Sequence, residues 1–330
     1  MKDTTMTTEA TIPDTKPRME DNACPGCGGR DADFLIEAED DLTGKPGRFR
    51  FVQCRSCDLA YQRPRILQDD IGAYYDSEYI AHRKKKDWGV FTPLYEWGMN
   101  GHDRRKVELC GQYVSLRRGM RVLDIGCAVG SFLQMLRKKH GAAVTGVDFK
   151  DLRENPLLEG VDFRLGVLAD IDFGDARFDL ITMWHFLEHD YEPLQTLERA
   201  RSLLAPGGRV VIEVPRLDST SFRLFKDRWP GLQAPQHTVL FDWKSLRAMC
   251  EKSGLSIVDH LPWGAFPAYF YLFAGAAFHV LRGKGLDVGK AIGPYFAGQL
   301  ALSPVLLFEK QLNLAMQTIV LERPSSGTSP

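Results

Sequence analysis

The sequence predicts an α/β protein whose main domain is a doubly wound parallel sheet, preceded by a small cysteine-bearing module. From Met120 onward, short apolar segments typical of buried strands alternate with segments typical of helices, as in a parallel sheet covered on both faces. Ahead of them, four of the seven cysteines form two Cys-x-x-Cys pairs. The 330 residues are enough for one large domain with smaller attachments.

The overall charge argues against a protein that neutralises many phosphates. Lysine and arginine together number 42 and acidic residues 43, so the formal net charge is −1, and the isoelectric point is about 6.7. Bulk nucleic-acid binding needs a clear excess of positive charge. With 44% hydrophobic residues and no internal repeat, the chain is otherwise ordinarily globular. Nucleic acid is therefore not the expected partner.

The two ends of the chain are expected to be tails. Residues 1–21 are polar, rich in threonine and without an apolar run, which predicts a disordered segment and not a signal or transit peptide. Residues 324–330 form a second, shorter tail. A cytoplasmic, reducing compartment is the default expectation, and there paired cysteines indicate a metal and not disulfides.

Residues 22–62 are expected to form a zinc-ribbon module. Cys24 and Cys27 make one knuckle, Cys54 and Cys57 a second, and the segment between them reads as a β-hairpin. Two such turns supply the closed tetrahedral Cys₄ arrangement typical of structural Zn²⁺. The alternatives are four buried thiols without metal, or a redox pair, although neither pair opens a helix after a strand. Zinc would fold a piece too small to hold a core alone.

The main domain should begin with strands at 121–125, 143–147, 178–183 and 208–214. Each is short, β-branched and apolar, as expected when both faces of a sheet are buried. Helices are expected at 131–139, 193–204 and 243–253. Pro193 suits a first helical position, and Asp242 a helix N-cap. Two late strands, 256–261 and 316–322, complete the pattern.

A glycine-rich turn joins the first strand to the first helix of this domain. The dinucleotide fingerprint G-x-G-x-x-G fits it poorly, because Ala128 and Ser131 stand at the second and third glycine positions. An acidic residue two positions before the first glycine, with small residues at every second position, instead resembles the DxGxGxG turn of class I S-adenosylmethionine-dependent methyltransferases. Asp124, Gly126, Ala128 and Gly130 fill that pattern, and the middle position differs from it by one methyl group.

Further motifs follow in the order of that family. Asp148 ends the second strand, residues 178–189 read FDLITMWHFLEH, and residues 203–215 read LLAPGGRVVIEVP. From about 120 to 260 the chain is similar to ubiquinone-biosynthesis-type O-methyltransferases and to zinc-knuckle methyltransferases of bacterial glycan, lipid and natural-product pathways. The resemblance implies a seven-stranded Rossmann-like sheet over 119–263 and 313–323.

The resemblance also implies a set of residues that bind S-adenosyl-L-methionine. In the family, the acid at the position of Asp148 binds both ribose hydroxyls. Taken alone, Asp124 and Asp148 could instead cap a turn. At the adenine loop the family often has Gly-Asp, where this chain has Gly166-Val167, and Asp170 is a substitute of unknown position. The expected cofactor contacts are Asp124, Gly126, Ala128, Gly130, Asp148, Phe149, Val167, Leu168 and Trp184.

Three histidines and one glutamate are the catalytic candidates. His185, Glu188 and His189 follow the fourth strand, and His237 precedes the helix after the fifth. Methyl transfer to oxygen benefits from a general base, for which histidine suits neutral pH, and His237 is the favoured base. Similar enzymes have an E-x-x-E-H run that can hold a divalent cation. This chain has histidine at the first position, which leaves a metal open. Glu188 and His189 could alternatively cap the next helix.

Two regions outside the core remain. Residues 63–118 are expected to be a helical lid or linker. There the aromatic run 74–79 resembles the lid segment of such enzymes, or else packs into a helical core. The basic run 82–86 predicts a solvated face, with anionic lipid or a diphosphate as the alternative.

Residues 264–312 are expected to form a hydrophobic helical insertion between the last two strands. Its first apolar run, 268–281, is too short to span a bilayer. The second, 291–308, is interrupted by Pro294, Gln299 and Pro304. The insertion is either a cap packed on the catalytic domain or on a second subunit, or an amphipathic device. In the latter case it would lie on a membrane surface as a peripheral contact, or receive an acyl or polyprenyl chain.

The predicted function is methyl transfer to a small-molecule, glycan or lipid-linked acceptor, with oxygen favoured. The cofactors expected are S-adenosyl-L-methionine and structural Zn²⁺. One alternative is an RNA-base methyltransferase whose zinc module binds RNA, which would need a basic groove. Another is a non-catalytic scaffold that binds the cofactor and docks a partner, for which loss of Asp124 or Asp148 would be the sign.

Overall fold

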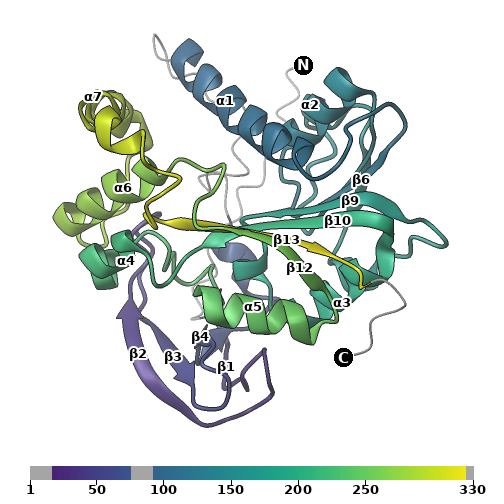
Figure 1. Cartoon of the computed structure of the whole chain (residues 1–330). Helices are drawn as coiled ribbons and strands as arrows, with labels where there is room; N and C mark the ends of the chain where they lie inside the picture. The colour runs from purple at the N-terminus through teal and green to yellow at the C-terminus, as the bar shows by residue number, and fades with distance from the viewer. Residues whose placement is uncertain (1–16, 76–91, 325–330) are drawn as a thin grey trace, which may run out of the picture.

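The computed structural model describes residues 17–75 and 92–324, and its centre is a seven-stranded sheet (Figure 1). The strand order is β12-β13-β10-β9-β6-β7-β8. All strands run parallel except β13, which is antiparallel to both of its neighbours. The strands are β6 (Arg121–Ile125), β7 (Ala143–Asp148), β8 (Asp162–Leu165), β9 (Phe178–Trp184), β10 (Leu204–Pro215), β12 (Ser256–Leu261) and β13 (Met316–Glu322). The predicted Rossmann-like fold is confirmed.

Helices cover both faces of this sheet. Alternate side chains of a strand point to opposite faces, so Val122 packs with α1 (Thr92–Gly111) and α2 (Ser131–His140). Leu123 packs with α3 (Pro193–Leu203) and α5 (Trp243–Lys252) on the other side. Asp242 caps α5 as predicted, in a reciprocal capping box with Ser245.

In the central sheet, the sequence missed one strand and misplaced the start of another. β8 lies at the sheet edge, where three of its four residues are exposed. Its sequence therefore lacks the apolar run by which its neighbours were found. β10 begins at Leu204 and not at residue 208, because Leu204 already pairs with Phe178 ahead of an irregularity in the ladder.

The cysteine module is built into the main domain. Its strands β2 (Ala32–Ala38) and β3 (Phe49–Cys54) form the predicted hairpin, and β4 (Ala60–Gln62) pairs with β3. The fourth strand of this sheet is β11 (Val239–Leu240), contributed by the main domain. Cys24, Val52 and Tyr61 belong to the same buried cluster as Val239 and Met249. The module therefore shares a core with the domain that it precedes.

The tail expected over residues 1–21 ends earlier than predicted. β1 (Met19–Glu20) pairs with β5 (Arg65–Ile66), and the Arg18 backbone N–H donates to Asp70 Oδ2 at 2.8 Å. Two long-range contacts hold this segment, which short-range sequence patterns do not reveal. The predicted lid residues 76–79 and the basic run 82–86 lie outside the described residues.

The predicted insertion is helical and consists of α6 (Ala268–Leu281) and α7 (Val288–Leu306). α6 lies against α4 (Thr220–Phe225) and α7 against α6, at one edge of the molecule (Figure 1). None of the described helices is long and apolar enough to cross a membrane.

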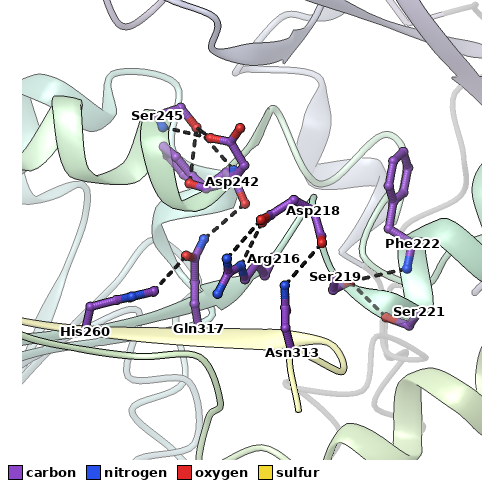
Figure 2. Close-up of polar contacts among 11 residues, drawn as sticks. Arg216, Asp218, Ser219, Ser221, Phe222, Asp242, Ser245, His260, Asn313 and Gln317 are labelled. Atoms are coloured by element: carbon purple, nitrogen blue, oxygen red, sulfur yellow. Dashed lines mark hydrogen bonds and ion pairs between the residues drawn. The ribbon is translucent and has the colours of Figure 1, made fainter. Parts of the chain in front are cut away.

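A partly buried polar network fixes the point at which the chain returns from the insertion to the sheet (Figure 2). Asn313 Nδ2 donates to the carbonyl oxygen of Asp218 at 3.2 Å. Gln317 Nε2 donates to the Phe241 carbonyl at 3.1 Å, and Gln317 Oε1 lies 3.3 Å from His260 Nε2. The start of β13 is thereby held to the loop after β10 and to the segment just before α5.

Candidate functional site

A large cavity adjoins the carboxyl ends of β6, β7 and β9. Its volume is ≈ 2340 Å³, whereas a pocket for one drug-sized ligand measures about 300–1,000 Å³. At one end it is lined by the glycine-rich turn, and at the other by aromatic residues of α6 and α7. The cavity therefore has room for a cofactor and a second molecule.

The glycine-rich turn has a backbone that most residues avoid. Gly126, Ala128 and Gly130 have φ values of 76°, 45° and 75°, all in the left-handed region. A Cβ on Gly126 would come within 2.5 Å of Phe186 Cδ2, and one on Gly130 would collide with Leu158. Gly130 is the N-cap residue of α2, and the first N–H groups of a helix have no partner within the helix.

Two buried carboxylates flank this turn. Thr182 Oγ1 donates to Asp124 Oδ1 at 2.6 Å, and burial raises the pKa of Asp124 to about 7 despite that bond. The Ala128 and Lys150 N–H groups donate to the two oxygens of Asp148 at 2.9 and 3.0 Å. Burial also raises the pKa of Asp148, against the effect of these donors. Asp148 thus holds the turn as a cap, and its remaining lone pairs are available to a ligand.

Eight of the nine residues predicted to contact the cofactor line the cavity; Gly130 does not. Gly130 acts instead through the start of α2 and its packing on Leu158. At the adenine loop Val167 lines the cavity, and so does Asp170, whose position the sequence left undetermined. Asp170 ends the short helix η5 (Leu168–Asp170) and is exposed.

His189 and His237 meet edge to face at the other side of the cavity, with ring centroids 4.4 Å apart. His237 Nδ1 lies 2.8 Å from the Gly231 carbonyl oxygen, and His189 Nδ1 lies 3.1 Å from that of Gln236. A carbonyl oxygen only accepts, so His237 Nδ1 carries the proton and His237 Nε2 keeps a lone pair. His189 Nδ1 also lies 2.8 Å from the Tyr75 hydroxyl, which can donate or accept, so both tautomers of His189 are compatible with its contacts. Burial lowers the pKa of both rings, which favours the neutral form.

Glu188 places a buried carboxylate beside these two imidazoles. It is 1% exposed, and neither of its oxygens accepts a hydrogen bond from a described residue. Potential ligand atoms of Glu188, His189 and His237 lie within 4.8 Å of one another. His237 donates its Nδ1–H to the Gly231 carbonyl, as metal-ligating histidines commonly do. The three residues therefore fit a divalent cation as well as a proton-transfer group.

His185 stands apart from that set, between two carboxylates. Its Nε2 lies 3.1 Å from Glu213 Oε1 and its Nδ1 3.6 Å from Glu188 Oε1. Burial alone would lower its pKa, but the two glutamates outweigh burial and raise it to about 9. A histidine that is protonated at neutral pH cannot accept a proton, so these contacts favour a positioning role for His185 over that of a base.

The segment that contains this site matches a known protein family. Residues 99–260 match the protein family described as "Methyltransferase domain". The chain carries a methyltransferase domain. This domain includes the glycine-rich turn, both carboxylates and all three histidines, whereas the cysteine cluster and the α6–α7 insertion lie outside the matched segment.

Relatives with curated names support the assignment of the methyltransferase domain. The chain is 31% identical over 142 residues to the ubiquinone biosynthesis O-methyltransferase of Stutzerimonas stutzeri (strain A1501), covering 40% of this chain and 58% of the relative. It is 34% identical over 124 residues to the same-named protein of Xanthomonas axonopodis pv. citri (strain 306), covering 34% and 52%. The chain thus spans about half the length of these relatives.

A solved structure similar to this chain is phosphoethanolamine N-methyltransferase 2 of Haemonchus contortus in complex with S-adenosyl-L-methionine. Sequence identity is 16%, the match covers 67% of this chain and 53% of that chain, and the TM-score is 0.45.

The four predicted zinc ligands lie together ahead of the methyltransferase domain. Cys24 Sγ is 3.5 Å from Cys57 Sγ, Cys27 Sγ is 3.5 Å from Cys54 Sγ, and all four sulfurs lie within 4.8 Å of one another. A disulfide needs about 2.05 Å, whereas tetrahedral zinc with Zn–S bonds of about 2.3 Å holds its sulfurs about 3.8 Å apart. The cluster fits a structural zinc ion.

Three further residues of the methyltransferase domain lie near the large cavity or contact its histidines, and the sequence did not predict them. Glu213 is fully buried and accepts the Ala265 and Phe266 N–H groups at 2.6 and 3.0 Å, so it joins His185 to the start of the insertion. On α1, His102 Nε2 is buried without a partner among the described residues, and Lys106 Nζ lies 5.3 Å from the Trp184 ring centroid. Nothing in their local sequence distinguishes them from an ordinary strand or helix face.

The paired state of His185 predicts how stability depends on pH. Its pKa in the folded protein, about 9, lies above the ordinary value of about 6.5. Its stabilisation is therefore complete below about pH 6.5 and is lost as the pH rises through about 9. We expect the free energy of unfolding in urea to fall between neutral and alkaline pH, and Glu213→Gln to flatten that fall. Glu251→Gln, in an exposed pair with Arg247, is the matched control. Equal slopes in wild type and Glu213→Gln would contradict the assignment.

Proposed function

We propose that this protein transfers a methyl group from S-adenosylmethionine to an oxygen atom of a small-molecule, glycan or lipid-linked acceptor, with a lipid-linked acceptor favoured. The observation that carries the proposal is the continuity of one cavity from the glycine-rich turn, past Asp148, to His237. Proximity and orientation supply much of the rate in such a transfer. A cavity that holds donor and acceptor side by side supplies both.

The methyltransferase domain would hold the cofactor through its own polar groups. When bound, S-adenosylmethionine supplies a methyl group made electrophilic by a sulfonium. Asp148 would accept from the ribose hydroxyls, and Asp170 from the adenine amine in place of the missing acid at position 167. Trp184, which is 6% exposed, closes the same part of the cavity and excludes water.

His237 is the proposed general base. As the acceptor oxygen takes the methyl group that bound S-adenosylmethionine would supply, His237 Nε2 would accept the proton of the acceptor hydroxyl. The Gly231 carbonyl holds the ring in the tautomer that leaves this nitrogen free. The resulting imidazolium would lie beside the buried carboxylate of Glu188, which also faces His185 Nδ1 at 3.6 Å. A divalent cation on Glu188, His189 and His237 would instead polarise the acceptor oxygen.

The lining of the far end of the cavity favours an acceptor with a large apolar part. Aromatic and aliphatic side chains from the insertion dominate it, and such surfaces bind hydrocarbon by removing it from water. They are Phe266, Phe270, Tyr271, Phe273, Phe278, Ile292, Tyr295 and Phe296. We expect S-adenosylhomocysteine release to be faster with 4-dodecylcatechol than with 4-methylcatechol as the acceptor probe. Equal rates with the two probes would argue for a small polar acceptor.

Two other functions are less well supported. An RNA-base methyltransferase would need a free, basic face on the zinc module. Here β4 of the module pairs with β11, and Lys244 and Lys252 of the domain contact its knuckles at Asp58 and Gly26. A scaffold without activity would not need to retain Asp124, Asp148 and a neutral His237 around one cavity.

Calorimetric titration with S-adenosylmethionine, with NAD as the control ligand, tests the proposal. Saturable binding of S-adenosylmethionine alone is the expected result. Binding of neither ligand to the zinc-loaded protein would favour a scaffold and overturn the proposed function.

Replacement of His237 tests the proposed base. We expect His237→Gln to lower turnover of 4-dodecylcatechol by about 10²–10⁴-fold, the usual contribution of a general base, with little change in S-adenosylmethionine affinity. His140→Gln, at the end of α2, should leave turnover unchanged. Unchanged turnover in His237→Gln would remove this residue from the mechanism. If Mg²⁺ or Zn²⁺ restored turnover lost on chelation, with wild-type protein, the cation would be the activating group.

A further inference from the structure

Helix α7 is apolar on two opposite faces. On the inner face Ile292, Tyr295 and Phe296 line the cavity. On the outer face Leu300 is 76% exposed and Leu307, just beyond the helix end, is 80% exposed. The exposed residues of 294–308 are all apolar except Ser303: Pro294, Ala297, Leu300, Ala301, Leu302, Pro304, Leu307 and Phe308.

A surface helix of a soluble domain ordinarily carries charged residues on its outward face. Residues 291–308 contain no charged residue at all. A contiguous exposed apolar patch of this kind marks an interaction surface, whereas single exposed leucines do not. The outer face of α7, formed by the exposed residues of 294–308, is therefore expected to be covered by a partner when the protein functions.

The charged residues that precede and follow this face in the chain are mainly positive, and Glu39 and Asp41 lie beside the turn between α6 and α7. Lys290, with 89% of its side chain exposed, precedes it, and Lys310 follows it. Arg282 and Lys284 lie in the turn between α6 and α7 and are also exposed. Asp287 offsets Lys290 at 3.1 Å, whereas Glu309 turns inward and accepts the Ala268 N–H at 2.9 Å. Cations at the ends of an apolar face match anionic headgroups above a hydrocarbon layer.

We propose that the outer face of α7 lies on the surface of an anionic membrane, with its apolar side chains among the acyl chains and the flanking cations at the level of the phosphates. α7 would then separate the bilayer from the acceptor cavity by the width of one helix. An acceptor with a hydrocarbon tail would reach the cavity without crossing water. This last consequence rests on the proposed function; the membrane contact itself does not.

A second copy of the chain is the other candidate for covering this face. A symmetric interface brings the same patch of both copies together. The cations at both ends of the face are Arg282, Lys284, Lys290 and Lys310. A symmetric dimer would bring the cations of one copy near those of the other, and they would repel one another. An anionic surface has no such cost, which is why the charges favour the membrane.

Co-sedimentation of the full chain with phosphatidylglycerol vesicles, against phosphatidylcholine vesicles, tests the proposal. We expect binding to phosphatidylglycerol at low salt, weaker binding as salt rises, and little binding to phosphatidylcholine. The double variant Leu300→Ser/Leu307→Ser should reduce the partition coefficient at least about tenfold, and Lys290→Glu/Lys310→Glu several-fold. The matched control is Leu165→Ser on the edge strand β8, which is exposed but lies outside this face and should bind as wild type does.

The variants must keep the fold for this test to count. Calorimetric S-adenosylmethionine affinity and the unfolding midpoint, measured on each variant, should equal those of the wild type. No sedimentation of wild type with phosphatidylglycerol at low salt would overturn the proposal, as would wild-type sedimentation of the double leucine variant. A dimer in light scattering that the leucine variant dissociates would assign the face to a second copy instead. Failure to bind S-adenosylmethionine in a protein that does sediment would sink the proposed function and leave the membrane contact standing.

Discussion

Replacing Cys54 by serine is expected to lower the midpoint of thermal unfolding by at least about 10 °C. Zinc in small Cys-ligated modules contributes about 10–16 kcal/mol to folding, and for a domain of this size each kcal/mol moves the midpoint by about 2–4 °C. The loss should spread into the methyltransferase domain, because Cys24, Val52 and Tyr61 share one buried cluster with Val239 and Met249.

The test compares metal content and melting of Cys54→Ser with those of Arg55→Ala. Arg55 lies in the same knuckle and is exposed, and its contact is with Asp33 and not with the cysteine cluster. The Arg55→Ala variant should keep one equivalent of zinc and melt close to the wild type, since exposed ion pairs contribute little to stability. If protein stripped of zinc by a chelator melts at the same temperature as the loaded protein, the prediction that zinc stabilises the fold is wrong.

Loss of the Asp148 carboxylate is expected to weaken S-adenosylmethionine binding by about 10²-fold or more. Hydrogen bonds to a charged group contribute about 1.5–3 kcal/mol each, and two ribose hydroxyls would lose theirs together. Asp148→Ala also releases the Ala128 and Lys150 N–H groups, which hold the glycine-rich turn in its left-handed backbone. Preorganisation of the turn is then lost in addition to the contacts themselves.

Asp148→Asn separates these two effects, because an amide of the same shape still accepts from one backbone N–H group. We expect calorimetry to show an intermediate affinity for it. Asp151→Asn, three residues along the same loop and paired with Arg153 on the surface, is the control that should bind as wild type does. Wild-type affinity in Asp148→Ala would show that this carboxylate does not bind the cofactor.

The sequence predicted those parts of the fold that depend on local patterns. Apolar runs located β6, β7 and β9, and Asp242 marked the start of α5, because each of these signals lies within a few residues of the element that it forms. β8 escaped because an edge strand half open to water has no apolar run. β11 escaped because two residues have no pattern of their own and become a strand only through the pairing of Val239 with Tyr61.

The candidate site likewise combines residues that local motifs indicate with residues that only long-range packing brings in. His237 and His189 were named as candidates because the resemblance places histidines there, but the Gly231 carbonyl that sets the tautomer of His237 lies in an irregular loop. Glu213 was missed because a single glutamate in an apolar strand reads as an exposed position. It is instead buried, with four donors around it from three different segments. Such a role is created by the packing of distant segments, which a single sequence does not display.

The pairing of β4 with β11 has a consequence for how the protein is made. Gln62 Nε2 donates to the carbonyl oxygen of His237, 175 residues further along the chain. At a synthesis rate of about 5–20 residues per second, the cysteine module leaves the ribosome about 9–35 seconds before the strand that completes its sheet. During that interval four thiols and the apolar surface around Tyr61 have no partner from the main domain. Early capture of zinc would protect the thiols and hold the hairpin ready, so metal supply during translation should govern the yield of active protein more than metal supply afterwards.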